Sequence, residues 1–278
     1  MFYDLIQPIP AVILAAGIFV AGVNMRAQDQ PTSVFGQSTQ SEAALMGVFY
    51  DLKQTQDHKS TNVDPDGYSK IIDEFISKGW DESVLNRYYQ VSKPLFTTQI
   101  FIPIMNADDG PKAFGAEKTV QPSRWVIHYK GQVSPPESGT YRFWGRADDV
   151  LIVGVNRKTV LVGCFPGIEL PKTNWKPSGP DGAKASDVDL RPGDWIDLKA
   201  NEIVDFDVLI GERPGGLFNA FLLLEKKGEN YAKDTSQLGQ GNPIFPIFQV
   251  APYDTPVIDN LDIEPKFAKG FPTWKSYQ

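Results

Sequence analysis

From Thr97 onward, apolar and polar residues alternate in short runs, and this alternation limits the possible folds more than any other feature of the chain. A period of two is typical of strands with one buried face, whereas an amphipathic helix repeats its apolar residues every three to four positions. Turn sequences such as Pro135-Pro136, Pro192-Gly193 and Pro214-Gly215-Gly216 separate several of the runs. No long helical pattern lies between them, so we exclude parallel βαβ units and predict a mainly β fold, an antiparallel β-sandwich.

The predicted strands are short because turns are frequent. Glycine and proline together account for 46 of the 278 residues (24 + 22), which is above their usual share. We predict strands over residues 46–53, 99–105, 124–132, 139–145, 150–155, 159–162, 195–198, 203–211 and 219–225.

One segment ahead of the alternating region has a helical period instead. Its apolar residues fall at i, i+3, i+4, i+7 and i+8 from Tyr68 to Ile76, and Gly79 is placed to end the helix. Asp81 can cap a second short helix. We therefore predict a small helical insertion over residues 68–90 that packs on the sheet.

An apolar segment from Ala11 to Val23 dominates the N-terminus. Its length fits the apolar part of a signal peptide and is below the ~18 residues typical of a spanning helix. No basic residue precedes Arg26, and Met25 is bulky for the −3 position of a cleavage site, so we favour a membrane anchor over a cleaved signal for residues 1–27. In either case we expect the body to be exported, to the periplasm or the cell surface of a cell envelope.

Two further segments flank the predicted sandwich. Residues 28–45 are rich in Gln, Ser and Thr and are typical of a flexible linker. Residues 229–278 interleave six prolines with aromatic residues, which argues against a helix, a central strand or a solvated tail. We predict an extended C-terminal arm that packs either on its own body or on a neighbouring subunit.

Charge and residue counts exclude several classes of function. The chain has 27 basic and 34 acidic residues, a net charge of −7, which argues against nucleic acid as a partner. The single cysteine, Cys164, excludes a disulfide framework, and two histidines, His58 and His128, leave little for a zinc site. Neither a Gly-x-Ser-x-Gly elbow nor a Gly-x-Gly-x-x-Gly loop is present, so we predict a protein that is not an enzyme.

The segment GTYRFWGRADDVLIVGVNRKTVLVG, Gly139 to Gly163, resembles the central signature of the PA14 domain, a β-sandwich of secreted and cell-surface proteins. In that signature a strand ending in paired aspartates, here Asp148-Asp149, leads into an apolar hairpin. MGVFYDL upstream and LRPGDWIDLKANEIVDFDVLIGERPGGLFNAFLLLEKKG downstream resemble the opening and closing strands. The resemblance covers residues 46–228. It departs from the family at Val150, in place of a glycine, and at Asn156-Arg157, in place of Asp-Gly.

In lectin-like members of this family, a cis peptide joins the two aspartates, which hold a Ca²⁺ ion that binds sugar hydroxyls. The resemblance therefore makes Asp148 and Asp149 candidate metal ligands. Ca²⁺ takes six to eight oxygens and two carboxylates supply up to four, so other donors are needed, for which Asn219, Asp205 and Asp207 are candidates. The alternative, which we favour because the glycine is lost, is that the two aspartates cap the loop by accepting backbone N–H groups.

Two functions follow from these features. The first is a non-enzymatic, membrane-anchored PA14-like module that acts as an interaction or structural subunit of a cell-envelope assembly, with protein subunits as partners. The alternative is a Ca²⁺-dependent carbohydrate-binding module. In this alternative the partner is a glycan, and Trp144 or Trp175 stacks on the sugar. Asn156 and Asn219 are further candidate binding residues.

Overall fold

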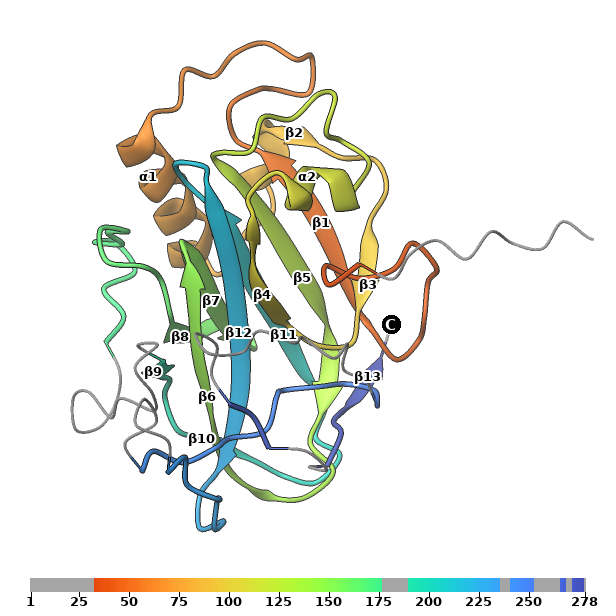
Figure 1. Ribbon diagram of the computed structural model, residues 1–278, viewed down its shortest axis with the longest axis vertical. Coiled ribbons are helices and arrows are strands. Elements are labelled where there is room, and N and C mark those ends of the chain that lie inside the picture. The colour runs from red at the N-terminus through yellow and green to blue at the C-terminus, as the bar shows by residue number, and fades with distance from the viewer. Residues whose placement is uncertain (1–32, 177–189, 236–240, 253–265, 269–271, 278) are drawn as a thin grey trace, which may run out of the picture. The chain divides into compact units, whose positions relative to one another are not determined.

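A computed structural model describes residues 33–176, 190–235, 241–252, 266–268 and 272–277 (Figure 1). The predicted anchor at residues 1–27 lies outside these ranges. Within them, no helix has the length and apolar character needed to cross a membrane.

Two antiparallel sheets form the predicted sandwich (Figure 1). The strands are β1 (Leu45–Asp51), β2 (Tyr89–Gln90), β3 (Leu95–Thr97), β4 (Phe101–Asn106), β5 (Trp125–Ser134), β6 (Gly139–Asp148), β7 (Val150–Val155), β8 (Lys158–Val162), β9 (Arg191–Pro192), β10 (Ile196–Leu198), β11 (Val204–Glu212), β12 (Leu217–Lys226) and β13 (Lys275–Tyr277). An eight-stranded sheet has the order β2-β1-β5-β11-β7-β8, with β3 also paired to β1 and β13 to β5. A five-stranded sheet has the order β10-β6-β12-β4, with β9 paired to β6.

Each predicted strand corresponds to a strand of the structure, and the prediction for residues 150–155 matches β7 at both ends. The sequence pattern gave no signal for β2, β3, β9 and β13, because each is only two or three residues long. Alternation cannot be recognised in so few residues.

The predicted helix covers the outer face of the eight-stranded sheet. Helix α1 (Pro65–Ser77) begins after Asp64, whose Oδ1 accepts the backbone N–H of Gly67 at 2.6 Å. Its Tyr68 and Phe75 are buried in a cluster with residues of β1, β5, β7 and β11. The predicted second helix is only a 3₁₀ turn, η1 (Leu85–Arg87). A short helix, α2 (Asp109–Ala113), was not predicted.

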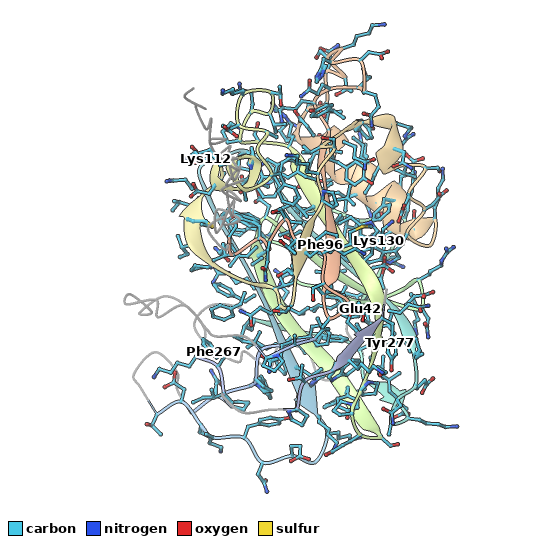
Figure 2. All side chains as sticks on the ribbon, turned by 90° about the vertical axis from the view of Figure 1, so that its right-hand side faces the viewer. Glu42, Phe96, Lys112, Lys130, Phe267 and Tyr277 are labelled. Carbon is cyan, nitrogen blue, oxygen red and sulfur yellow. The ribbon has the colours of Figure 1, made fainter. Side chains whose placement is uncertain are left out.

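The described parts of the C-terminal arm pack on the body of the same chain. Phe245 stacks on Trp144 on the outer face of the five-stranded sheet, with ring centroids 5.1 Å apart. Trp274 enters the main core and contacts Phe248 at 5.4 Å, and β13 then pairs with β5. Figure 2 shows Tyr277 of β13 on the half of the body away from α2. Of the two predicted arrangements, the structure therefore has the one in cis.

Part of the predicted flexible linker is instead packed on the body. Phe35 is buried and stacks on Phe218 with ring centroids 6.0 Å apart. The Tyr129 hydroxyl donates to the carbonyl oxygen of Phe35 at 2.8 Å. Residues 33–37 of the predicted linker therefore pack on the body, where Val34 also contacts the core and Gln37 forms a β-bridge with Phe96.

Candidate functional site

The paired aspartates lie where the chain passes from one sheet to the other. Asp148 is the last residue of β6, Val150 is the first of β7, and the peptide bond between Asp148 and Asp149 is cis. In the eight-stranded sheet, β11 pairs with β7 and ends at Glu212. In the five-stranded sheet, Asn219 of β12 lies opposite Asp148. Strand ends from both sheets therefore bring four oxygen-bearing side chains to one end of the sandwich.

Asp149 is buried and forms hydrogen bonds with the backbone of two loops. Its Oδ2 accepts the backbone N–H of Arg213 at 2.8 Å, and its carbonyl oxygen accepts the N–H of Phe165 at 2.7 Å. The Arg213 guanidinium donates to the carbonyl oxygen of Gly167, also at 2.8 Å. The contact with the Arg213 N–H is the capping bond that the loop-capping alternative predicts. It uses one carboxylate oxygen, which has further capacity to accept bonds.

Glu212 is a buried acid that the sequence pattern did not single out. Its Oε1 accepts the N–H of Gly215 at 2.7 Å, whereas its Oε2 has no partner within the described ranges. The pKa of Glu212 is raised to about 8, mainly by burial. The hydrogen bond from Gly215 opposes this rise, and the charges of Asp149 and Asp148 contribute to it. Burial, and then the charge of Asp149, also raise the pKa of Asp148. The surroundings of this site therefore solvate negative charge poorly, which favours the protonated form of its carboxyl groups.

Of the three predicted extra donors, only Asn219 lies beside the aspartate pair. It is 3% exposed, and its Oδ1 has no hydrogen-bond partner in the described part of the chain. Asp205 and Asp207 lie toward the other end of β11 and have other partners. Asp205 accepts a bond from Gln132 at 3.0 Å, and Asp207 lies 2.8 Å from Nε2 of His128. The two aspartates of β11 are therefore excluded as ligands of the same ion.

Trp144 does not form the exposed platform that the sequence suggested. It is 1% exposed beneath Phe245, and its Nε1 donates to Glu225 at 2.7 Å. The arm covers the sheet face on which Trp144 lies, so a sugar cannot reach this ring. Trp175 is half-buried and its Nε1 donates to Asp194 at 3.2 Å.

Asn156 follows the end of β7 that is far from Asp149. The rise per residue of an extended strand puts the two residues about 20 Å apart. With φ angles of 49° and 62°, Asn156 and Arg157 both have the left-handed backbone that a type I′ hairpin turn requires. The Oδ1 of Asn156 accepts the N–H of Asp205 at 3.0 Å. Asn156 therefore shapes the β7–β8 hairpin and does not belong to the aspartate site.

Exposed apolar side chains flank the aspartate site. Phe165, whose N–H is bonded to Asp149, is 46% exposed, and Leu217, two residues before Asn219, is 55% exposed. The site thus places apolar surface next to carboxylate and amide oxygens.

The donors at this site suit a hard cation. Among the described residues, no group of three or more His, Cys, Asp and Glu side chains is arranged to hold a metal ion. The set at this end is mixed, with two aspartates and the amide oxygen of Asn219. Carboxylate and amide oxygens are the ligands that Ca²⁺ prefers, and the unpartnered buried oxygen of Asn219 is a donor of this kind.

No protein-family model matches the sequence, and no curated protein matches it. The solved structures that the chain resembles include PA14 domains over about three quarters of its length. A PA14 sugar-binding domain from an RTX adhesin is 15% identical, with a TM-score of 0.43 over 74% of this chain and 95% of that chain. The PA14 domain of the antifreeze protein MpAFP is 16% identical, with a TM-score of 0.39 over 73% of this chain and 90% of that chain.

A third similar structure is the epithelial adhesin 6 A domain from Candida glabrata, solved in complex with Galb1-3GlcNAc. It is 14% identical, with a TM-score of 0.38 over 79% of this chain and 98% of that chain. The fold of this protein is a mainly β sandwich of two antiparallel sheets with small helices.

Proposed function

We propose that this protein is a carbohydrate-binding module whose site is the end of the sandwich formed by Asp148, Asp149 and Asn219. The observation that carries the proposal is the buried Oδ1 of Asn219, which has no partner in the described chain and lies beside two carboxylates. Leaving a buried acceptor unpaired costs about 1–3 kcal/mol. A bound cation or ligand donor at this position removes that cost.

Asp148, Asp149 and Asn219 would hold a calcium ion. When bound, Ca²⁺ offers coordination positions to vicinal sugar hydroxyls, since it takes six to eight oxygens and these residues supply at most five. The contact between Asp149 and the Arg213 N–H keeps that carboxylate in place without a ligand.

Phe165 supplies the apolar part of the proposed site. Sugars have apolar C–H faces as well as hydroxyl groups, and an exposed aromatic ring binds such a face. The N–H of Phe165 is bonded to the carbonyl oxygen of Asp149, so its backbone is fixed next to the polar residues. We assign to Phe165 the stacking role first expected of Trp144.

The export of the body and the anchor at residues 1–27 remain part of this proposal, as does its lack of catalytic activity. The described parts of the arm pack on their own body, so the hypothesis of an envelope subunit has to rest on features other than the arm.

The test is glycan-array binding of the exported body in excess Ca²⁺ and in excess EDTA, for the native protein and for Asp148→Asn. We expect binding by the native protein in Ca²⁺ only, and loss of binding in the variant. Asp205→Asn, at the far end of β11, is the matched control. Equal glycan binding in Ca²⁺ and in EDTA would contradict the calcium site, and no binding to any glycan would contradict the function.

A further inference from the structure

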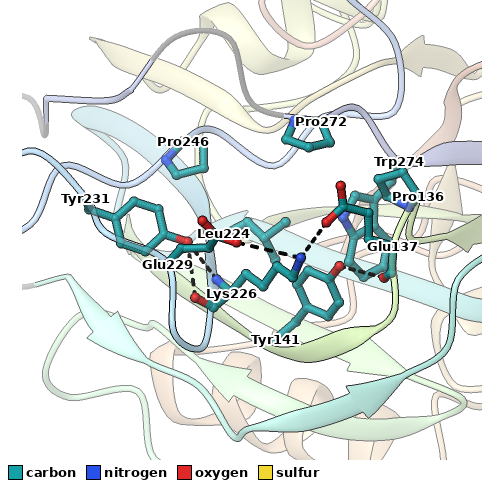
Figure 3. Close-up of a pocket in the computed structure, with 10 residues that line it drawn as sticks. All are labelled: Pro136, Glu137, Tyr141, Leu224, Lys226, Glu229, Tyr231, Pro246, Pro272 and Trp274. Carbon is teal, nitrogen blue, oxygen red and sulfur yellow. Dashed lines mark hydrogen bonds and ion pairs between the residues drawn. The ribbon is translucent and has the colours of Figure 1, made fainter.

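A pocket lies at the other end of the sandwich, between the C-terminal arm and the strands β6 and β12 (Figure 3). Its volume is about 200 Å³. The arm contributes Pro246, Pro272 and Trp274, and the body contributes Tyr141 near the start of β6. Because Asp148 is at the end of the same strand, the pocket and the aspartate pair are about 20 Å apart. The pocket is therefore separate from the proposed glycan site.

The apolar walls of this pocket are held in place without a ligand. The rings of Tyr141 and Trp274 meet edge to face, with centroids 5.3 Å apart. The Tyr141 hydroxyl donates to the carbonyl oxygen of Glu137 at 2.7 Å. The Leu224 N–H donates to the carbonyl oxygen of Pro246 at 2.9 Å, which attaches the arm to β12. Preformed walls reduce the entropy lost when a ligand binds.

The polar side of the pocket has an excess of negative charge. The ammonium of Lys226 lies 2.5 Å from a carboxylate oxygen of Glu137 and 3.7 Å from one of Glu229. One cation is thus shared by two anions, which leaves a net charge of −1 on the cluster. The side chains of Glu137 and Glu229 are 60% and 47% exposed, so their carboxylates are accessible to a ligand.

We infer that this pocket binds a small organic cation, an amine or quaternary ammonium group on a short apolar stem. The carboxylates of Glu137 and Glu229 attract the positive charge, and the aromatic and proline walls receive the stem. The half-buried ring of Tyr231, which also lines the pocket, adds to this preference, because the faces of aromatic rings attract cations. A cavity volume of about 200 Å³ accommodates a small ligand such as a lysine side chain or choline.

The test uses the full protein in EDTA, so that the calcium site does not contribute. The probes are choline and Nα-acetyl-lysine methylamide, and the neutral control is Nα-acetyl-norleucine methylamide, which has the same stem without the charge. Binding is followed by the indole N–H signal of Trp274 in NMR spectra and by calorimetry. We expect both cations to bind and the neutral compound to bind at least tenfold more weakly. Binding of choline alone would restrict the ligand to a quaternary ammonium group, and binding of the lysine probe would extend the ligand to a protein side chain.

A double variant and a control variant distinguish the loss of negative charge from a loss of folding. We expect Glu137→Gln combined with Glu229→Gln to reduce cation affinity roughly tenfold with an unchanged melting temperature, because exposed ion pairs add little stability. Glu117→Gln, which replaces another exposed glutamate, should bind normally. Binding of the norleucine probe as tight as that of the cations, or no binding of either cation at millimolar concentration, would overturn the inference. Neither result bears on the aspartate site, which is tested with Ca²⁺ and glycans.

Discussion

Asn219 of β12 lies directly opposite Asp148 of β6, so two neighbouring strands place a buried amide and a carboxylate side by side at the end of the sandwich. The two residues are distant in sequence and belong to different segments of the PA14-like pattern. Their proximity depends on strand pairing alone. It makes the amide oxygen of Asn219 a sensitive probe of whether a cation binds there.

Replacement of Asn219 by leucine should have opposite effects with and without calcium. In EDTA we expect the free energy of unfolding to rise by about 1 kcal/mol, because a buried acceptor without a partner is removed. In Ca²⁺ at a hundred times its Kd, the native protein should gain about 2.7 kcal/mol, or roughly 5–10 °C in Tm, and the variant should gain much less. Thermal melts of both proteins in Ca²⁺ and in EDTA provide the measurement. An equal calcium shift in the variant would exclude Asn219 as a ligand.

The pKa of Glu212 predicts how stability depends on pH in the metal-free protein. The pKa of Glu212 is about 8 in the folded state, whereas the ordinary pKa of a glutamate carboxyl group is 4.5. Between these values the folded state holds a proton that the unfolded state has lost, so the free energy of unfolding falls as pH rises from 4.5 to 8. Glu212→Gln should remove this part of the pH dependence and be the more stable protein at pH 8. Urea denaturation in EDTA across this range, with Glu117→Gln as control, tests this. An unchanged slope in the Glu212 variant would show that this carboxyl group is not the one titrating.

Phe165→Ala should reduce glycan affinity without changing calcium affinity. Loss of an aromatic stacking contact costs about 1 kcal/mol, or roughly fivefold in Kd. The matched control is Ile203→Ala, since Ile203 is 51% exposed and lies immediately before β11, far from the aspartates. Calorimetric titration with calcium and then with a glycan identified on the array separates the two affinities. Normal glycan binding by the Phe165 variant would mean that the apolar contact comes from elsewhere.

Trp274→Ala should destabilise the whole sandwich. The side chain is 2% exposed and contacts Tyr141 and Phe248 in the main core. Large-to-small changes at such positions cost about 3–5 kcal/mol. Trp175→Ala, at a half-buried position outside the arm, should cost much less. Denaturant melts measure both variants. A small loss for Trp274 would indicate that the arm detaches from the body in solution.

The strands and the main helix could be predicted because their periodicity is local. The continuous apolar run of 150–155 and the apolar stripe from Tyr68 to Ile76 each specify an element within a few residues. The burial of Trp144 could not be predicted, because it depends on Phe245, which lies 101 positions later in the chain. Alternation shows which side chains share a face of a sheet but not what covers that face.

Some residues of the candidate site could also be identified from the sequence, whereas others required the structure. The resemblance to a known signature singled out Asp148 and Asp149, and their chemistry suggested Asn219 as one of three donors. Strand register was needed to select Asn219 over the two aspartates of β11 and to add Glu212. The signal available for Glu212 was a single acid at a strand end before a Pro-Gly-Gly turn, which many surface loops share.

The position of the aspartate pair at strand ends, between the two sheets, determines how a glycan can approach it. A polymer lying flat across a sheet would contact sheet residues along several strands, but Asp148 and Asp149 lie at the junction between the sheets. A glycan bound as we propose would therefore approach along the strand direction, with the end of its chain first. Such a site would select the terminal unit of a saccharide chain over its interior units, so the number of chain ends, and not the total mass of polysaccharide, would set how many copies of this protein a surface could hold.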